Sequence, residues 1–336
     1  MELNNIFKGQ TANEVWLKAF KQLDEISNKP QESRIGLTHE ILHAFISIKD
    51  PRQRWITARK PAFNIAFAIA EIVWIMNGRN DSEFLNFWNS KLPEYAGKGP
   101  EYHGAYGHRL RKNFGFDQLD KAYYALKNNP KSRQVVLQIW EPSRDFPDKE
   151  GIAVNADIPC NIISLIKVRD GKLEWQQIMR SNDIILGLPY NLIQFTTIQE
   201  IMAGWLELEV GTYNHLSDSL HLYLENHNKY GISKEIELIQ NVDDLRLKKS
   251  ESEKIFKEFS DKIDSIVVDN YSEKDLKNIF IWDGAPESYG NLLSIICAEA
   301  ARKAEYYELS NEFILKCKNP LLVLFWKQWM KRFSIN

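Results

Sequence analysis

The sequence predicts an α+β fold in which a large mixed sheet is packed by helices and followed by a mostly helical C-terminal appendage. Three observations carry this prediction. Strand-like and helical runs occur without regular alternation up to residue 223, the composition becomes highly charged after about residue 235, and helical periodicity then continues to the C-terminus. We therefore expect a main domain over residues 1–234 and a helical extension over residues 235–336.

The first half of the chain contains three predicted elements. Residues 12–27 place Val15, Phe20 and Leu23 at near-helical spacing, which predicts a helix. LTHEILHAFISI (37–48) is rich in β-branched residues and predicts a strand. A buried helix is expected between Pro61 and Gly78, and the polar stretch 79–118 is expected to form a long loop region.

The second half supplies the remaining strands. RQVVLQIW (133–140) and residues 211–223 have strand character, and residues 162–180 form a predicted hairpin that turns at Asp170 and Gly171. Residues 191–206 predict a long buried helix between them. Beyond residue 235, the runs at 291–317 and 320–333 again have helical spacing.

Composition restricts the class of protein. The formal net charge is -2 and the basic residues are scattered, so no nucleic-acid or anionic-membrane partner is expected. No apolar stretch reaches the roughly 18 residues that span a bilayer, and the N-terminus resembles no secretory signal, which predicts a cytoplasmic protein. Cys160, Cys297 and Cys317 form neither a disulfide framework nor a metal pair.

One motif suggests a metal site that the context disfavours. His39, Glu40 and His43 spell HExxH, which on a helix presents two zinc ligands and a general base. Here the motif lies in a strand-like run, where side chains alternate between faces, and no third ligand follows at the usual spacing. We predict no metal, and a zinc peptidase is the least favoured function.

Cys160 is the candidate nucleophile. It follows Pro159 at the entrance to an apolar strand, where a lone cysteine is commonly a small buried hydrophobe. Three arginines at loop or strand edges, Arg34, Arg133 and Arg180, change that balance, because guanidinium groups promote thiolate formation and also bind phosphate.

Two further runs are dense in polar side chains. MRSNDIILGLPYNLIQF offers Arg180, Ser181 for a phosphate, and Asn191, whose amide either reads a heterocycle edge or caps a helix. HLSDSLHLYLENH sets His221 and Tyr223 on one face of a strand, as ligand contacts or as satisfied core polar groups.

Taken together, these segments resemble the thymidylate synthase family, which includes the deoxyuridylate and deoxycytidylate hydroxymethylases. The resemblance spans residues 31–230 and rests on several short motifs in order: SRIG, IAEIVWIMNG, YGHRLR, NPKSRQVV, DIPC, MRSNDIILGLPYN and SLHLY. It implies a thymidylate synthase-like catalytic domain over residues 1–234.

The resemblance also implies roles for individual residues. Cys160 matches the nucleophile, and the phosphate-binding positions match Arg34, Arg180 and Ser181. Arg133 matches an arginine donated across the interface of a homodimer.

The remaining matched positions surround the pyrimidine and the folate. They imply that Glu71 relays protons and that Tyr106 assists removal of the C5 proton, and that Asn191 reads N3 and O4 of uracil. His221 and Tyr223 match the pair that holds the sugar 3′-hydroxyl. The positions matching the folate site are Asp183, Gly187 and Tyr190.

The activity implied is one-carbon transfer from 5,10-methylenetetrahydrofolate to C5 of a pyrimidine nucleoside monophosphate through a Cys160 adduct at C6, with dUMP to dTMP as the leading expectation. A hydroxymethylase acting on dUMP or a cytosine nucleotide is the alternative within the class. A non-catalytic nucleotide-binding homologue is the alternative from another class.

Several departures from the family pattern keep the product open. Gln134 and Asn161 stand where synthases have arginine and histidine, and KLPEYAG contains no Trp where a Trp-rich segment is expected. The chain continues past the short apolar tail of the synthases, and Ser219 and Leu220 resemble the hydroxymethylase branch. Methyl or hydroxymethyl product, deoxyribose or ribose, the role of residues 235–336, and a cellular or viral source all remain open.

Overall fold

The computed structural model describes residues 5–26, 29–33, 36–233, 239–267 and 271–333. Its strands are β1 (Ile6–Gly9), β2 (Gln31–Ser33), β3 (Gly36–Ile48), β4 (Arg59–Lys60), β5 (Val136–Gln138), β6 (Asn161–Arg169), β7 (Lys172–Met179), β8 (Asn182–Asp183), β9 (Glu209–Tyr223) and β10 (Gly231–Ile232). The helices of the main domain are α1 (Ala12–Asp24), α2 (Ile65–Met76), α3 (Ser82–Asn86), α4 (Leu92–Ala96), α5 (Tyr106–Arg111), α6 (Gln118–Asn128), α7 (Pro142–Asp145), α8 (Leu188–Trp205) and α9 (Leu224–His227).

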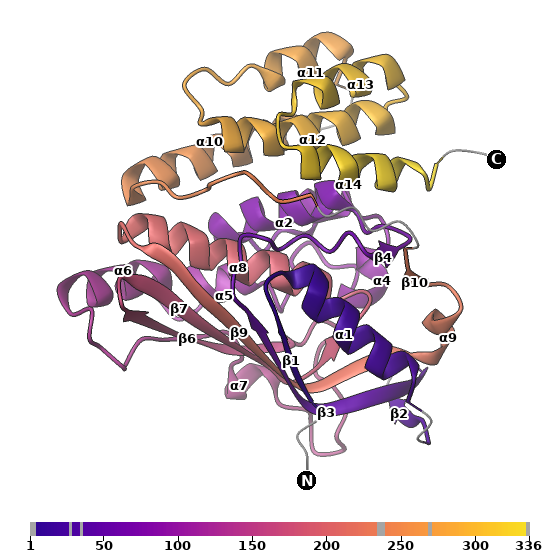
Figure 1. Ribbon diagram of the computed structural model, residues 1–336, viewed down its shortest axis with the longest axis vertical. Coiled ribbons are helices and arrows are strands. Elements are labelled where there is room, and N and C mark those ends of the chain that lie inside the picture. Colours follow the sequence, from indigo (N-terminus) through magenta and orange to yellow (C-terminus); the bar gives the residue numbers. More distant parts are fainter. Residues whose placement is uncertain (1–4, 27–28, 34–35, 234–238, 268–270, 334–336) are drawn as a thin grey trace.

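The large mixed sheet is confirmed. Its strand order is β1-β3-β9-β7-β6-β5, with β2 added beside β3 and β8 beside β9. The β3–β9 and β6–β7 pairs are antiparallel, whereas β7–β9 and β1–β3 are parallel. Helices α1, α2 and α8 lie on one side of this sheet (Figure 1).

Local chemistry explains where the main elements begin and turn. Asp170 and Gly171 both have positive φ, 50° and 73°, as a tight two-residue hairpin turn between β6 and β7 requires. The helix expected from Pro61 begins at Ile65, because the Asn64 side chain accepts a hydrogen bond from Phe67 N at 3.0 Å and caps it.

The predicted loop over residues 79–118 is wrong in part, since α3, α4 and α5 are short helices within it. Helix α5 packs tightly on α2 at Gly107, where an added Cβ would lie 2.4 Å from Ile75 O. This close approach brings the start of α5 beside the buried face of α2. The composition of the stretch is typical of loops, and tertiary packing supplies the stabilisation that its short helices need.

The predicted helical C-terminal region is confirmed as α10 (Lys249–Val267), α11 (Glu273–Phe280), α12 (Glu287–Lys303), α13 (Tyr307–Lys316) and α14 (Pro320–Met330). These helices form a layer over α2, on the side away from the sheet (Figure 1). None of the helices described is long and apolar enough to cross a bilayer.

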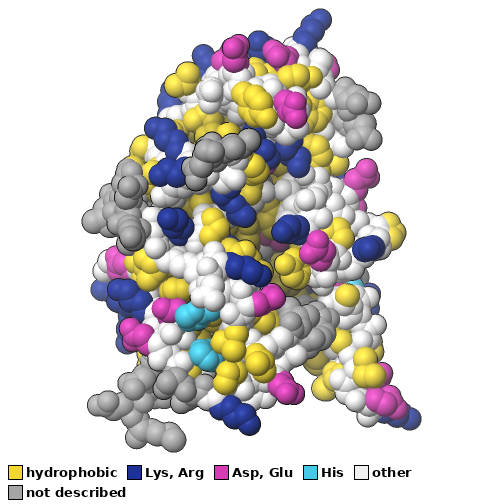
Figure 2. All heavy atoms as spheres, turned by 90° about the vertical axis from the view of Figure 1, so that its right-hand side faces the viewer, with side chains coloured by type: hydrophobic (Ala, Val, Ile, Leu, Met, Phe, Trp, Pro, Cys, Tyr) yellow, Lys and Arg dark blue, Asp and Glu magenta, His cyan; other side chains and the backbone are white. Residues whose placement is uncertain are grey.

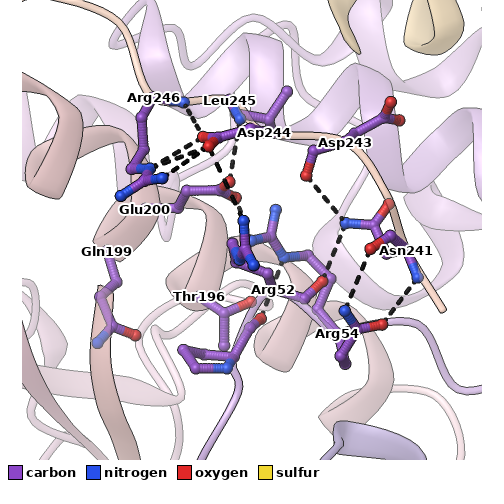
Figure 3. Close-up of polar contacts among 12 residues, drawn as sticks. Arg52, Arg54, Thr196, Gln199, Glu200, Asn241, Asp243, Asp244, Leu245 and Arg246 are labelled. Carbon is purple, nitrogen blue, oxygen red and sulfur yellow. Dashed lines mark hydrogen bonds and ion pairs between the residues drawn. The ribbon is translucent and has the colours of Figure 1, made fainter. Parts of the chain in front are cut away.

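An extended segment joins this layer to the main domain through buried polar contacts (Figure 3). Arg54 and Glu200 form a fully buried ion pair, and Leu245 N donates to the second Glu200 oxygen at 3.0 Å. Asn241 N donates to Gln53 Oε1 at 2.8 Å. A buried charge is costly unless it is paired, so the Arg54–Glu200 pair and its hydrogen bond to Leu245 must be kept together. This cluster therefore fixes the position of the helical appendage on the main domain.

The opposite face of the sheet presents an apolar row. In the strand register, Phe45 lies opposite Leu216, Leu216 opposite Ile178, and Ile178 opposite Ile163. Residues directly opposite in a sheet share a face, so this row crosses β3, β9, β7 and β6. All four side chains are only half-buried in the isolated chain.

The outer surface shows mixed charge. On the face drawn in Figure 2, basic and acidic side chains are interspersed among apolar and neutral ones. A mixed distribution of this kind does not create the single-sign field that draws a protein onto nucleic acid.

Candidate active site

Cys160 and Arg180 lie together where β6 begins and β7 ends. Arg180 N donates to Cys160 O at 2.9 Å, which extends the β6–β7 ladder by one pair. The Arg180 guanidinium donates to Pro159 O at 3.0 Å and Ile158 O at 3.1 Å, so it holds the turn that presents the thiol. Cys160 is half-buried and in no disulfide. Ser181 follows Arg180 and is also half-buried.

Glu71 reaches the site from α2; its side chain is half-buried, and its Oε2 atom is buried. Burial raises the pKa of its carboxyl group to about 7, and the Asp157 carboxylate adds to the rise, while a hydrogen bond with Gln194 opposes it. The Oε2 atom of Glu71 has no hydrogen-bond partner among the described residues. A carboxyl group that titrates near neutrality can both donate and accept a proton at physiological pH.

Tyr106 is the first residue of α5 and belongs to the same cluster. Burial raises the pKa of its hydroxyl well above the ordinary value, and the nearby Cys160 and Asp157 raise it further, while a hydrogen bond with Asn161 opposes the change. Asp157 accepts a hydrogen bond from Gly104 N at 2.7 Å, and its own pKa is raised by burial. The tyrosine therefore remains protonated and can act as a hydrogen-bond donor.

Asn191 lies in the first turn of α8, but it does not cap the helix. Gly187 occupies the N-cap position, and the Asn191 amide instead joins a buried polar network. Asn161 Nδ2 donates to Asn191 Oδ1 at 3.4 Å, and Asn191 Nδ2 donates to Asn182 Oδ1 at 3.2 Å. The helix-cap interpretation is therefore wrong.

Asp183 and His221 lie opposite each other on β8 and β9. The Asp183 carboxylate accepts hydrogen bonds from Ile185 N at 2.6 Å and Leu186 N at 3.0 Å, which fixes the turn before α8. Burial raises the pKa of Asp183 and lowers that of His221, and the attraction between the two groups opposes both shifts. The His221 and Tyr223 rings pack perpendicular to each other with centroids 5.1 Å apart.

Tyr190 forms part of an aromatic wall that continues into the appendage. Burial raises the pKa of Tyr190 to about 12, and its ring packs edge-on against Phe63 at 5.1 Å. Phe63 in turn contacts Phe325 of α14 at 4.6 Å. Just beyond α14, the Arg332 guanidinium donates to Ala62 O at 2.9 Å. The last helix thus supports the same wall as Tyr190.

Of the other two predicted arginines, only Arg133 is described by the structure, and it stands apart from this cluster. Arg34 lies outside the described residues. Arg133 is exposed and lines a shallow cavity with Arg169, Asp170 and Gly171, at the end of β6 opposite Cys160. The 9 residues of this strand separate the two ends by about 25 Å. Within one chain, Arg133 therefore does not reach the thiol.

Sequence reasoning missed three polar residues around the site: Asp157, Gln194 and Asn182. Asp157 stands three residues before the nucleophile in the DIPC motif, and Gln194 follows Asn191 by three, a spacing that places both on one helical face. No sequence pattern pointed to Asn182, because the residues on β9 that it contacts are distant in sequence.

The HExxH residues lie in β3, as expected, and His43 contacts Asp218 at 2.9 Å on the exposed surface. In the part of the chain that the structure describes, no group of three or more His, Cys, Asp or Glu side chains is placed to hold a metal ion.

Comparison with known proteins identifies the family. The sequence profile of thymidylate synthase matches residues 24–280. The chain is 37% identical over 224 residues to a deoxyuridylate hydroxymethyltransferase of Bacillus phage SP01, covering 63% of this chain and 56% of the relative. It is 30% identical over 167 residues to a thymidylate synthase of Vesicomyosocius okutanii, covering 48% of this chain and 60% of the relative. A putative thymidylate synthase of Methanothermobacter thermautotrophicus is 28% identical over 232 residues, covering 67% of this chain and 94% of the relative.

The chain therefore belongs to the thymidylate synthase family, whose matched segment covers most of its length. The alignments with the phage and Vesicomyosocius proteins span only a little over half of those relatives.

Proposed function

We propose that this protein transfers a one-carbon unit from 5,10-methylenetetrahydrofolate to C5 of dUMP, with Cys160 as the covalent nucleophile. The observation that carries the proposal is the convergence of the Cys160 thiol, the Glu71 and Tyr106 acid–base groups and the Asn191 amide at one end of the sheet. A nucleophile, a proton relay and a heterocycle reader are the three functions that this reaction needs.

In the proposed reaction, the Cys160 thiolate adds to C6 of the pyrimidine and the C5–C6 electron pair becomes available at C5. C5 then forms a bond to the one-carbon unit of the folate, and the C5 proton leaves with help from the Tyr106 hydroxyl. The bond between the transferred carbon and the folate nitrogen breaks, the nitrogen keeps the electron pair, and an exocyclic methylene group remains at C5. Addition of hydride or water to this methylene group and elimination of the thiolate then restore the ring. Because Arg180 holds the turn around Cys160, the sulfur keeps its position through both bond changes.

Glu71 serves the proton transfers at the pyrimidine. Its pKa of about 7 leaves both protonation states populated near neutral pH, and its unpartnered oxygen is available to a water or substrate atom. The Asn191 amide offers one donor and one acceptor side by side, which matches O4 and N3–H of uracil. For the folate, we propose the wall built by Asp183, Gly187 and Tyr190.

The second candidate product is 5-hydroxymethyl-dUMP. It is favoured by the Ser219-Leu220-His221 motif and by the similarity to proteins named deoxyuridylate hydroxymethyltransferase. The two reactions share every step up to the exocyclic methylene group at C5. Hydride transfer from the reduced folate, which leaves as dihydrofolate, then gives the methyl product, whereas addition of water, with release of tetrahydrofolate, gives the hydroxymethyl product.

The experiment is incubation of purified protein with C5-tritiated dUMP and the folate, followed by mass spectrometry of the nucleotide. We expect tritium release that Cys160→Ala abolishes, and a product heavier by a methylene group, or by a methylene group plus one oxygen for hydroxymethyl. If the wild type releases no more tritium than Cys160→Ala, the proposed function is wrong. Parallel incubations with UMP, dCMP and CMP identify the preferred sugar and base.

We also propose that the protein acts as a homodimer with Arg133 completing the phosphate site of the partner. The half-buried apolar row of Phe45, Leu216, Ile178 and Ile163 suits a self-complementary contact between two sheets. Arg133 cannot reach Cys160 of its own chain, yet it projects at an edge of the same sheet.

The dimer proposal is tested by subunit complementation. Cys160→Ala is expected to be inactive and Arg133→Ala weakly active. A mixture that exchanges subunits should regain about a quarter of wild-type activity, because half of its dimers are mixed and each mixed dimer contains one complete site of two. A mixture no more active than the average of its components would contradict shared sites.

A further inference from the structure

A continuous relay of buried hydrogen bonds runs beneath the candidate active site and includes the Asn191 amide. It connects side chains from β6, β7, β8, α8 and β9, all of them nine-tenths or more buried. In order along the relay, its members are Trp175, Gln177, Asn161, Asn191, Asn182, His215 and Tyr213.

The polarity of this relay is set at one end by an indole. Trp175 Nε1–H donates to Gln177 Oε1 at 3.2 Å, and an indole N–H can only donate. Gln177 therefore turns its Nε2 to Asn161 Oδ1, at 2.8 Å. Asn161 then turns its Nδ2 to Asn191 Oδ1, at 3.4 Å. Each amide dictates the orientation of the next, so a donor-only group on β7 decides which way Asn191 faces.

The other end of the relay can adapt to either polarity. Asn191 Nδ2 donates to Asn182 Oδ1, and Asn182 Nδ2 faces His215 Nε2 at 3.0 Å. This makes Nε2 the acceptor and leaves Nδ1–H to face the Tyr213 hydroxyl at 3.0 Å. A neutral imidazole can exchange tautomers and a hydroxyl can rotate, so neither group by itself imposes a direction. Ser164, whose hydroxyl donates to Gln177 Oε1 at 2.6 Å, can rotate in the same way. Asn182 Nδ2 also faces the Ser217 hydroxyl at 3.2 Å, which can rotate, and Met179 Sδ at 3.3 Å. The thioether only accepts, but it is a weak acceptor and opposes reversal less than the indole does.

We propose that Trp175 is a specificity-determining positioning residue, which locks the Asn191 amide in the orientation that accepts a 4-oxopyrimidine and rejects a 4-aminopyrimidine. The proposal deepens the proposed function and rests on Asn191 as the reader of uracil. Uracil presents N3–H as donor and O4 as acceptor, whereas cytosine presents the reverse pattern. Binding cytosine therefore needs the amide turned over, which places like groups against Asn161 and Asn182 unless the whole relay reverses.

Trp175→Phe removes the fixed donor while keeping an aromatic ring in the core. The amides, the imidazole and the hydroxyl groups of the relay can then all reverse, and only the weak contact of Asn182 Nδ2 with Met179 Sδ is lost when cytosine binds. We expect the ratio of the dCMP to the dUMP dissociation constant, measured by titration calorimetry, to fall at least about fivefold. Trp16→Phe is the matched control, because Trp16 is also buried and donates to Ile184 O at 2.7 Å outside the relay.

A second variant tests the same idea from within the relay. In Asn161→Asp, a carboxylate that only accepts faces both Gln177 and Asn191, which turns Asn191 Nδ2 towards residue 161. We expect this variant to shift the same ratio towards dCMP. The added negative charge of the aspartate weakens the binding of both nucleotides to the same extent. Its effect therefore cancels in the ratio of the dCMP to the dUMP dissociation constant. The Asn161→Asp variant still tests the proposal if Trp175→Phe fails to fold.

The outcomes separate the two proposals. Wild-type protein that binds dUMP well above dCMP, with a ratio lowered by Trp175→Phe and Asn161→Asp and unchanged in Trp16→Phe, supports the relay. An unchanged ratio in both relay variants, or an equal change in Trp16→Phe, overturns it while leaving the proposed function intact. Wild-type protein that binds neither nucleotide defeats the proposed function itself.

Discussion

Glu71→Gln should change the pH dependence of stability in a defined direction. Burial raises the pKa of Glu71 from 4.5 to about 7 in the folded protein. Between these values the unfolded chain is ionised at this position while the folded chain stays protonated, so stability falls as pH rises and then levels off above about pH 7. At 1.36 kcal/mol per pH unit, the total loss is about 3 kcal/mol, of which about 2.5 kcal/mol falls between pH 5 and pH 8.

The assay is urea denaturation of wild type and variant at pH 5 and pH 8. The amide introduced by Glu71→Gln does not titrate and can also donate to Gln194 Oε1, which has no partner among the described residues. The variant should therefore gain about 2 to 3 kcal/mol relative to wild type on going from pH 5 to pH 8. Glu83→Gln, on the exposed side of α3, is the control. A stability difference that is the same at both pH values would refute the reasoning.

Three further predictions concern the framework around the site. Arg54→Met should lower the free energy of unfolding by about 3 to 5 kcal/mol, because it leaves Glu200 buried and unpaired, and the double variant with Glu200→Leu should recover most of the loss in urea titrations. Gly171→Ala should lower the free energy of unfolding by about 1 kcal/mol, because Gly171 has a positive φ and its added Cβ would meet no atom within 4 Å. Gly290→Ala, inside α12, is the control and should leave the free energy of unfolding unchanged or raise it, as measured by thermal melts of both variants. If the proposed dimer forms through the apolar row, Leu216→Asp should convert it to monomer in sedimentation velocity, whereas Leu315→Asp on the exposed side of α13 should leave it intact.

Local patterns in the sequence were sufficient for most elements of the fold. The Asp170-Gly171 hairpin, the capped helix α2 and the buried helix α8 follow from turn chemistry and from hydrophobic spacing, which act over a few residues. The short helices α3, α4 and α5 escaped prediction because packing stabilises them, as at Gly107 against Ile75. The boundary proposed near residue 234 stays a prediction.

The sequence by itself determined which residue types are available to the proposed site, because motif order pointed to Cys160, Arg180 and Asn191 as residue types suited to addition and recognition. Only the tertiary structure decided their working states. The pKa of Glu71 depends on burial and on Asp157, which lies on a distant segment. The orientation of Asn191 depends on hydrogen bonds whose members come from five separate elements. Burial and hydrogen-bond polarity are properties of neighbours in space, and no local pattern encodes them.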